Sequence, residues 1–306
     1  MAKLLRLAAC AALLFPVVAS AQQNRTAVSI NGLDTNPCTV ASPCRSFTAA
    51  MAQTNSGGEI IAVDSGGYGA FIVSRAVSVQ AAPGVYAGVT AASGDGIYVD
   101  AGASSTVVLR NLVLNGLGTG HAGISITATS AEVHIENCVI QNFATYGVFA
   151  FLNVRISDSI IRKCGSAIWI DNAGAAVKAT VVNVAMKEMD GGDLVSPGTG
   201  IFAHRNATVT VRNSVAVKAT NSAFRAAGGG VLNLESCTAT DNGTGITAGI
   251  SLNSLTPGTV RLSNNLVTGN ATGISNGGTI ETWGNNKIAG NTTNLSGSAL
   301  TGVAQN

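Results

Sequence analysis

Three residues that could do acid–base chemistry recur along the middle of this chain, namely Asp171, His204 and Arg225. A carboxylate, an imidazole and a guanidinium can move a proton and stabilise negative charge when they lie together. They are spaced by 33 and 21 residues, each within the range of one solenoid repeat. If successive turns place them about 4.8 Å apart, they form one polar cluster. We therefore take all three as catalytic candidates.

Aromatic residues precede this cluster at a fixed offset. Trp169 and Phe202 stand two residues before Asp171 and His204, and Phe149 holds the equivalent position one turn earlier, so that the three rings share an outward face beside the cluster. Aromatic residues make up only 5% of the chain. Three rings on successive turns predict a ligand-binding stripe that stacks against sugar rings. The alternative is that a loop covers the rings as a satellite hydrophobic cluster.

The longest insertion between repeats lies just before Phe202 and carries Glu188, Asp190 and Asp193. Carboxylate oxygens are the ligands that Ca²⁺ prefers, and long loops on compact folds often carry function. These residues are candidate metal ligands, although the segment lacks a complete calcium-loop pattern. The alternative is that the three acids are simply solvated.

The element that must position these residues is a degenerate repeat of the form V-x-I-x-N-x-x-I. Its units start at Val107, Val133, Val154, Val177, Val209, Leu232, Val260 and Ile280. The corner position that follows holds Asn111, Asn137, Asp158, Val181, Asn213, Ser236, Asn264 and Gly284. Asn, Asp and Gly tolerate the left-handed backbone of a tight corner. With a further G-I-x-A strand in most units, the pattern predicts three strands per turn and a parallel β-helix.

Both ends of the chain differ from the repeat. Residues 1–21 have the basic start, short apolar stretch and Ala19-Ser20-Ala21 cleavage site of a signal peptide, which predicts a secreted protein in the periplasm or outside the cell. No later segment reaches the roughly 20 residues of a membrane span. We predict an N-terminal cap over 22–57 with a short helix at Ser46–Gln53, a β-helix over 58–295, and a tail over 296–306.

Cysteine and charge usage narrow the possibilities further. Cys38 and Cys44 lie close together in a Pro-punctuated loop of a predicted exported chain, which favours a disulfide. Cys138, Cys164 and Cys237 are predicted to be buried thiols. Charged residues make up 10% of the chain and the net charge is +2, which argues against a nucleic-acid partner.

Two acidic residues of the first strand are better explained by pairing than by catalysis. Glu136 falls opposite Arg110, and Glu235 falls between Arg212 and Arg261, so cross-strand ion pairs are expected. The two glutamates are four turns apart, about 19 Å, whereas paired glycosidase carboxylates lie about 5 to 9.5 Å apart.

The arrangement resembles the right-handed parallel β-helix superfamily of pectate lyases and polygalacturonases. The similarity rests on the helix that follows Pro43-Cys44, on Gly58-Glu59-Ile60 and Gly67-Tyr68-Gly69, and on the repeated turns. Within this superfamily, the sequence most resembles exported bacterial β-helix repeat proteins of undefined activity. The resemblance implies an all-β, single-domain solenoid. The Asn-Thr-Asp, Asp-Asp and Gly-His-Gly motifs of polygalacturonases are missing, and in Trp169-Ile170-Asp171-Asn172 an asparagine replaces the histidine of a pectate lyase element.

Three classes of function follow. We favour an exported protein that binds a polysaccharide or a cell-surface partner without turnover, without a firmly implied cofactor but with Ca²⁺ as a candidate. The alternatives are a polysaccharide lyase or glycoside hydrolase with a non-standard site, and a purely structural solenoid.

Overall fold

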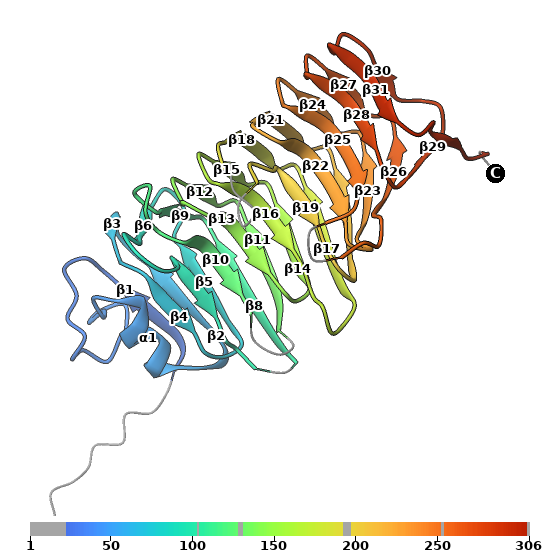
Figure 1. Cartoon of the computed structure of the whole chain (residues 1–306). Helices are drawn as coiled ribbons and strands as arrows, with labels where there is room; N and C mark the ends of the chain where they lie inside the picture. The colour runs from blue at the N-terminus through green and yellow to red at the C-terminus, as the bar shows by residue number, and fades with distance from the viewer. Residues whose placement is uncertain (1–22, 103, 128–130, 192–196, 252–253, 305–306) are drawn as a thin grey trace, which may run out of the picture.

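The computed structural model describes residues 23–102, 104–127, 131–191, 197–251 and 254–304. Over these ranges the chain winds into one elongated solenoid with three parallel sheets along its length (Figure 1). Most turns contribute one strand to each sheet, and each strand pairs with the equivalent strands of the turns before and after. The all-β parallel β-helix predicted from the repeat is confirmed.

Sheet A has twelve strands among the described residues. They are β1 (Gln23–Val28), β2 (Thr54–Ala62), β5 (Val77–Ala81), β8 (Ser105–Arg110), β11 (Ala131–Glu136), β14 (Val154–Ser157), β17 (Val177–Val182), β20 (Ala207–Arg212), β23 (Val231–Glu235), β26 (Thr259–Ser263), β29 (Thr279–Thr282) and β32 (Thr301–Gly302).

Sheets B and C have ten strands each over the same described ranges. Sheet B consists of β3 (Gly66–Gly67), β6 (Ala87–Thr90), β9 (Leu112–Asn115), β12 (Val139–Gln141), β15 (Ile160–Arg162), β18 (Ala185–Met189), β21 (Val215–Ala219), β24 (Thr238–Thr240), β27 (Leu266–Thr268) and β30 (Lys287–Ile288). Sheet C consists of β4 (Phe71–Val73), β7 (Ile97–Val99), β10 (Ala122–Ile126), β13 (Tyr146–Ala150), β16 (Ser166–Ile170), β19 (Ile201–Ala203), β22 (Ser222–Ala227), β25 (Thr244–Gly249), β28 (Thr272–Asn276) and β31 (Thr293–Gly297).

The core fills the space between the three sheets and follows from strand alternation. In β11, Val133 and Ile135 point inward and are fully buried, whereas Glu136 lies on the outer face. Val133 stacks in register on Val154 of the next turn. Because a shift of one residue would turn every apolar side chain outward, the buried stripes hold the register of the whole stack.

The corner after each sheet A strand has the left-handed backbone that the sequence predicts, with φ of 50° at Asn137 and 49° at Asn213. One repeat was placed wrongly. Val154 pairs with Ala179 and not with Val177, so the corner of that turn is Asn183, with φ of 56°, and not Val181. Ala179 holds the position at which most other repeats begin with valine. The repeat pattern therefore matched Val177, two residues too early.

The N-terminal end of the solenoid is closed by helix α1 (Phe47–Gln53), as predicted. Ser46 caps the helix by accepting a hydrogen bond from the Ala49 amide. Phe47 is fully buried and its ring lies 4.7 Å from that of Phe71 in the first turn of sheet C. The helix thus covers apolar core that a solenoid end would otherwise expose. Cys38 and Cys44 form a disulfide beside it, with Cα atoms 4.5 Å apart.

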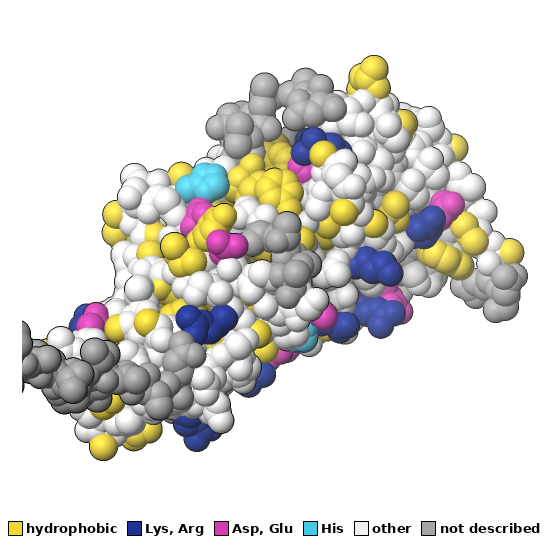
Figure 2. Space-filling view, turned by 90° about the horizontal axis from the view of Figure 1, so that it is seen from below, with side chains coloured by type: hydrophobic (Ala, Val, Ile, Leu, Met, Phe, Trp, Pro, Cys, Tyr) yellow, Lys and Arg dark blue, Asp and Glu magenta, His cyan; other side chains and the backbone are white. Residues whose placement is uncertain are grey.

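Hydrogen-bonded strands extend past the predicted β-helix limits of 58–295, because β1 joins sheet A before that range and β32 after it. Most of the surface seen from below is neither hydrophobic nor charged, as a chain rich in Gly, Asn, Ser and Thr requires (Figure 2). Basic and acidic side chains lie together along one edge of this view. The free thiols of Cys138, Cys164 and Cys237 are buried, as expected.

Candidate functional site

The outer face of sheet C brings the predicted aromatic residues onto neighbouring strands. Phe149 of β13 pairs with Trp169 of β16, which pairs with Phe202 of β19. The rings meet each other more than they meet solvent, since Trp169 is 9% exposed and Phe202 3%. Their centroids lie 4.6 Å apart in an edge-to-face arrangement. With Tyr146 they form a hydrophobic cluster separate from the core, as the packing alternative expects. Sugar stacking stays a prediction and applies best to Phe149, which is only partly buried.

Asp171 follows β16 and lies at the corner where the chain turns from sheet C toward sheet A. It is 4% exposed, and Arg205 donates two hydrogen bonds to its carboxylate at 2.9 and 2.5 Å. Burial alone would raise the pKa of Asp171, but contacts with His204 and Arg205 together hold it below the usual value. The residue is therefore an anion held in place by a bidentate partner.

His204 lies one turn further along, buried beside this carboxylate. Its Nδ1 is 3.3 Å from Asp171 Oδ2, which is an ion-pair distance without hydrogen-bond geometry. On the other side, Nε2 lies 2.9 Å from the hydroxyl of Ser251, in the segment that follows β25. The structure thus brings together Asp171 and His204, as predicted, and adds Arg205 and Ser251.

Sequence reasoning missed these two partners for different reasons. Arg205 is adjacent to His204, so a search of the chain beside each candidate would have found it. Ser251 lies two turns away, outside the repeating strands, and its amide bonds to Ser254 O at 3.0 Å in an isolated antiparallel bridge. Its placement depends on loop geometry that strand periodicity does not predict.

Arg225 pairs in register with Phe202 but does not join the Asp171 cluster. Its guanidinium carbon lies 4.8 Å from the centre of the Phe202 ring, in a cation–π contact. Burial lowers the pKa of Arg225 from its usual value. The predicted trio therefore consists of one contacting pair, Asp171 and His204, with Arg205 where Arg225 was expected.

Several buried polar atoms on this face have no hydrogen-bond partner among the described residues. They are Ser125 Oγ, Trp169 Nε1, His204 Nδ1 and Arg225 Nε. Each such group costs free energy when it is shielded from water, so a concentration of them on one face calls for an explanation.

The candidate metal ligands lie elsewhere. Glu188 and Asp190 line a shallow groove at the corner between sheets B and C, together with Asn142 and Lys163. Asp193 lies outside the described residues. Within the part of the chain that the structure describes, no group of three or more His, Cys, Asp or Glu side chains could hold a metal ion. Calcium binding stays a prediction.

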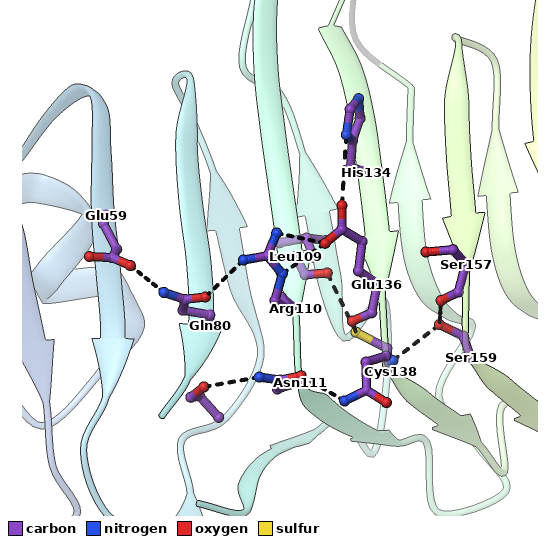
Figure 3. A network of polar contacts seen from close by, with 12 residues as sticks. Glu59, Gln80, Leu109, Arg110, Asn111, His134, Glu136, Cys138, Ser157 and Ser159 are labelled. Atoms are coloured by element: carbon purple, nitrogen blue, oxygen red, sulfur yellow. Dashed lines mark hydrogen bonds and ion pairs between the residues drawn. The ribbon is translucent and has the colours of Figure 1, made fainter. Parts of the chain in front are cut away.

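The outer face of sheet A carries a ladder of polar side chains. Figure 3 shows its first half, in which Glu59, Gln80, Arg110 and Glu136 are linked from turn to turn. The expected Arg110–Glu136 ion pair is present at 2.6 Å. Further along, Arg212 pairs with Glu235 at 2.8 Å, while Arg261 pairs with Glu281 at 2.6 Å. Glu235 thus has one of its two expected partners.

A groove of about 670 Å³ lies along the second half of this face. Its lining side chains come from three successive sheet A strands and the corner after β29; they are Thr210, Arg212, Asn233, Leu234, Glu235, Arg261, Ser263 and Trp283. Trp283 is partly buried at one end, and sequence analysis did not single it out. The surface combines an aromatic ring with amide, hydroxyl, carboxylate and guanidinium groups repeated at the strand spacing.

This architecture agrees with the known proteins that the chain matches. The family model for the right handed beta helix region matches residues 54–184 and 122–293, which together cover well over half of the sequence. The chain belongs to the right-handed β-helix family. No curated protein matches it in sequence.

Solved structures with this fold include polysaccharide-acting proteins. The pectate lyase Pel9A is 15% identical with a TM-score of 0.61, over 91% of this chain and 79% of that one. An alginate lyase from Paenibacillus sp. str. FPU-7 is 13% identical with a TM-score of 0.54, over 91% of this chain and 100% of that one. A rhamnogalacturonan lyase is 14% identical with a TM-score of 0.53, over 84% and 72%. At these identities the likeness establishes the fold, which polysaccharide lyases share.

The described residues contain no helix that is long and apolar enough to cross a membrane.

Proposed function

We propose that this protein is exported and binds an extended polysaccharide in the groove of sheet A without cleaving the chain. The observation that carries the proposal is the groove itself, where Trp283 adjoins a polar ladder of at least three turns. A ring such as that of Trp283 can stack on a sugar, and side chains repeated about every 4.8 Å can bond successive sugar hydroxyls. Export rests on the signal-peptide features of residues 1–21.

The charges in the groove favour binding over cleavage. Glu235 is held in an ion pair with Arg212. It is the one carboxylate among the described residues that line the groove, whereas glycosidases use a pair of carboxyl groups about 5 to 9.5 Å apart. Arg212 and Arg261 could shift toward a uronate carboxylate, since their ion pairs are partly exposed.

The test is affinity gel electrophoresis of the purified mature protein, in native gels that contain soluble neutral glucan, xylan, polygalacturonate or alginate. We expect retention by one of these polymers, weakened at least about tenfold in Trp283→Ala and Arg261→Ala. Tyr86→Ala is the matched control, because Tyr86 is 52% exposed and lies outside the groove. Equal retention of wild type and both groove variants would exclude this groove. No retention by any polymer would favour the structural solenoid.

Two further arms test the remaining candidate residues. Phe149→Ala tests the stripe of Phe149, Trp169 and Phe202; loss of retention there, with Trp283→Ala unaffected, would move the binding site to sheet C. Retention measured with Ca²⁺ and with chelator, in wild type and Asp190→Asn, tests a calcium requirement. Release of reducing or unsaturated ends by the wild type would favour the lyase or hydrolase alternative.

A further inference from the structure

We propose that Ser251, His204 and Asp171 form a nucleophile–base–carboxylate relay that hydrolyses an acyl ester. Ser251 Oγ lies 2.9 Å from His204 Nε2, and His204 Nδ1 lies 3.3 Å from Asp171 Oδ2. In such relays one imidazole nitrogen takes the serine proton while the carboxylate orients the ring through the other nitrogen. The three side chains stand in the order that this chemistry requires, and the longer second contact is within the range seen before a substrate binds.

The burial of each residue suits its role. His204 and Asp171 are 3% and 4% exposed, so water does not compete for their contact. Ser251 is only partly buried, unlike its two partners, and its Oγ also lies 3.4 Å from Ser254 O. The two hydrogen bonds from Arg205 fix the Asp171 carboxylate in one orientation. A hydroxyl within hydrogen-bond reach of a base that is itself oriented by a third group is the arrangement expected of an activated nucleophile.

Gly228 packs directly against this relay, in a place where no larger residue fits. A Cβ atom at this position would lie 2.7 Å from His204 Cδ2 and 3.2 Å from Ser251 Oγ. Gly228 and Gly229 have φ of 65° and 86° in a turn closed by the Gly230 amide bonding to Ala227 O at 3.1 Å. Neither central amide donates a hydrogen bond to another described residue. Of the two, Gly228 lies beside the nucleophile, and its amide is the candidate donor to an oxyanion.

The reaction balances with water as the only co-reactant. Ser251 Oγ bonds to the acyl carbon as its proton passes to His204 Nε2, and the alcohol leaves with that proton. Water then attacks the acyl-enzyme, with His204 taking its proton and returning it to Ser251 Oγ as the carboxylic acid leaves. We assign the ester to a small acyl group, because Gly228 packs against the relay and leaves little room. That the alcohol is a sugar hydroxyl rests on the proposed function.

The experiment uses the full mature chain with p-nitrophenyl acetate and a fluorophosphonate that labels activated serines. We expect steady hydrolysis, labelling of the peptide that contains Ser251, and loss of both by at least about a hundredfold in Ser251→Ala. Ser254→Ala, at the bridge partner of Ser251, is the matched control and should keep both. His204→Gln should lose labelling as well, with folding checked by circular dichroism.

Three outcomes would overturn the relay: no labelling of the wild type, labelling at another serine, or hydrolysis that persists in Ser251→Ala. None of them depends on polysaccharide retention, so failure of the relay and failure of the groove are distinguishable. Release of acetate from an acetylated xylan by wild type, and not by Ser251→Ala, tests the sugar ester directly.

Discussion

Truncation of Trp169 separates the two interpretations of the aromatic stripe. If the ring served only to stack on sugars, Trp169→Ala would remove retention and leave stability nearly unchanged. The structure indicates the opposite, because Trp169 is 9% exposed and packs edge-to-face on Phe202 at 4.6 Å and on Tyr146 at 5.4 Å. Replacing a buried Trp by Ala costs about 3 to 5 kcal/mol. Removing the unpaired Nε1 offsets about 1 kcal/mol of this. We expect a net loss of about 3 kcal/mol.

Urea unfolding measures this loss, with circular dichroism and the fluorescence of Trp283 as probes. The chain has two tryptophans, so Trp283 is the only indole left in the variant. The control is Trp283→Ala, followed by circular dichroism and the fluorescence of Trp169; it removes a partly exposed ring and should cost less than about 1.5 kcal/mol. A Trp169→Ala loss below about 1 kcal/mol with an unchanged urea dependence would refute the packing argument. Disagreement between the two probes would mean that the turns unfold separately.

Three other outcomes are expected. Burial raises the pKa of the Cys138 thiol to about 12, so Ellman's reagent at pH 8 should react with it only after unfolding; reaction in the native state would contradict its burial. The pKa of Asp171 is lowered in the folded protein, so its carboxylate stabilises the fold at pH values above the unfolded pKa of about 3.9. The stability advantage of wild type over Asp171→Asn should therefore hold at pH 6 and shrink as the pH falls below about 4. Urea midpoints from pH 6 to 3 measure this advantage, and a difference that stays constant would rule it out. Asn270 is buried, and its side chain bonds to Ala239 O and to the side chains of Asn242 and Asn291. Asn270→Ala should therefore cost about 2 kcal/mol in urea unfolding, against almost none for the exposed Asn31→Ala; equal costs would contradict a stabilising role of these hydrogen bonds.

The fold could be predicted because every turn repeats the same physical problem. A residue such as Ile135 must point inward and one such as Asn137 must turn the corner, so pattern and structure agree wherever both signals are present. The prediction was wrong by two residues in β17. Ala179 holds the position that is a valine in most other repeats, so the repeat pattern matched Val177 instead. Strand register also placed Phe149, Trp169 and Phe202 on neighbouring strands.

The candidate site was harder to predict because its contacts leave the repeat. Alternation predicts which face a side chain occupies but not whether that face is covered, so the sequence left open whether Trp169 and Phe202 are buried or face a ligand. Ser251 contacts His204 from a position after β25, outside the repeating strands, which strand periodicity does not place. Trp283 likewise follows β29 at a corner where the repeat ends.

The polar groups of sheet C are difficult to explain by packing alone. A buried carboxylate, imidazole and guanidinium lose hydration, and well-packed apolar side chains of similar size are often equally or more stabilising. Trp169 Nε1 and Arg225 Nε add further buried donors without partners among the described residues. Stability therefore gives no reason to keep His204 facing Ser251, whereas hydrolysis does. A Ser251→Ala variant that is as stable as wild type and inactive would show that the hydroxyl is retained for chemistry. A variant whose free energy of unfolding falls by several kcal/mol would show instead that the hydrogen bond of Ser251 to His204 serves stability.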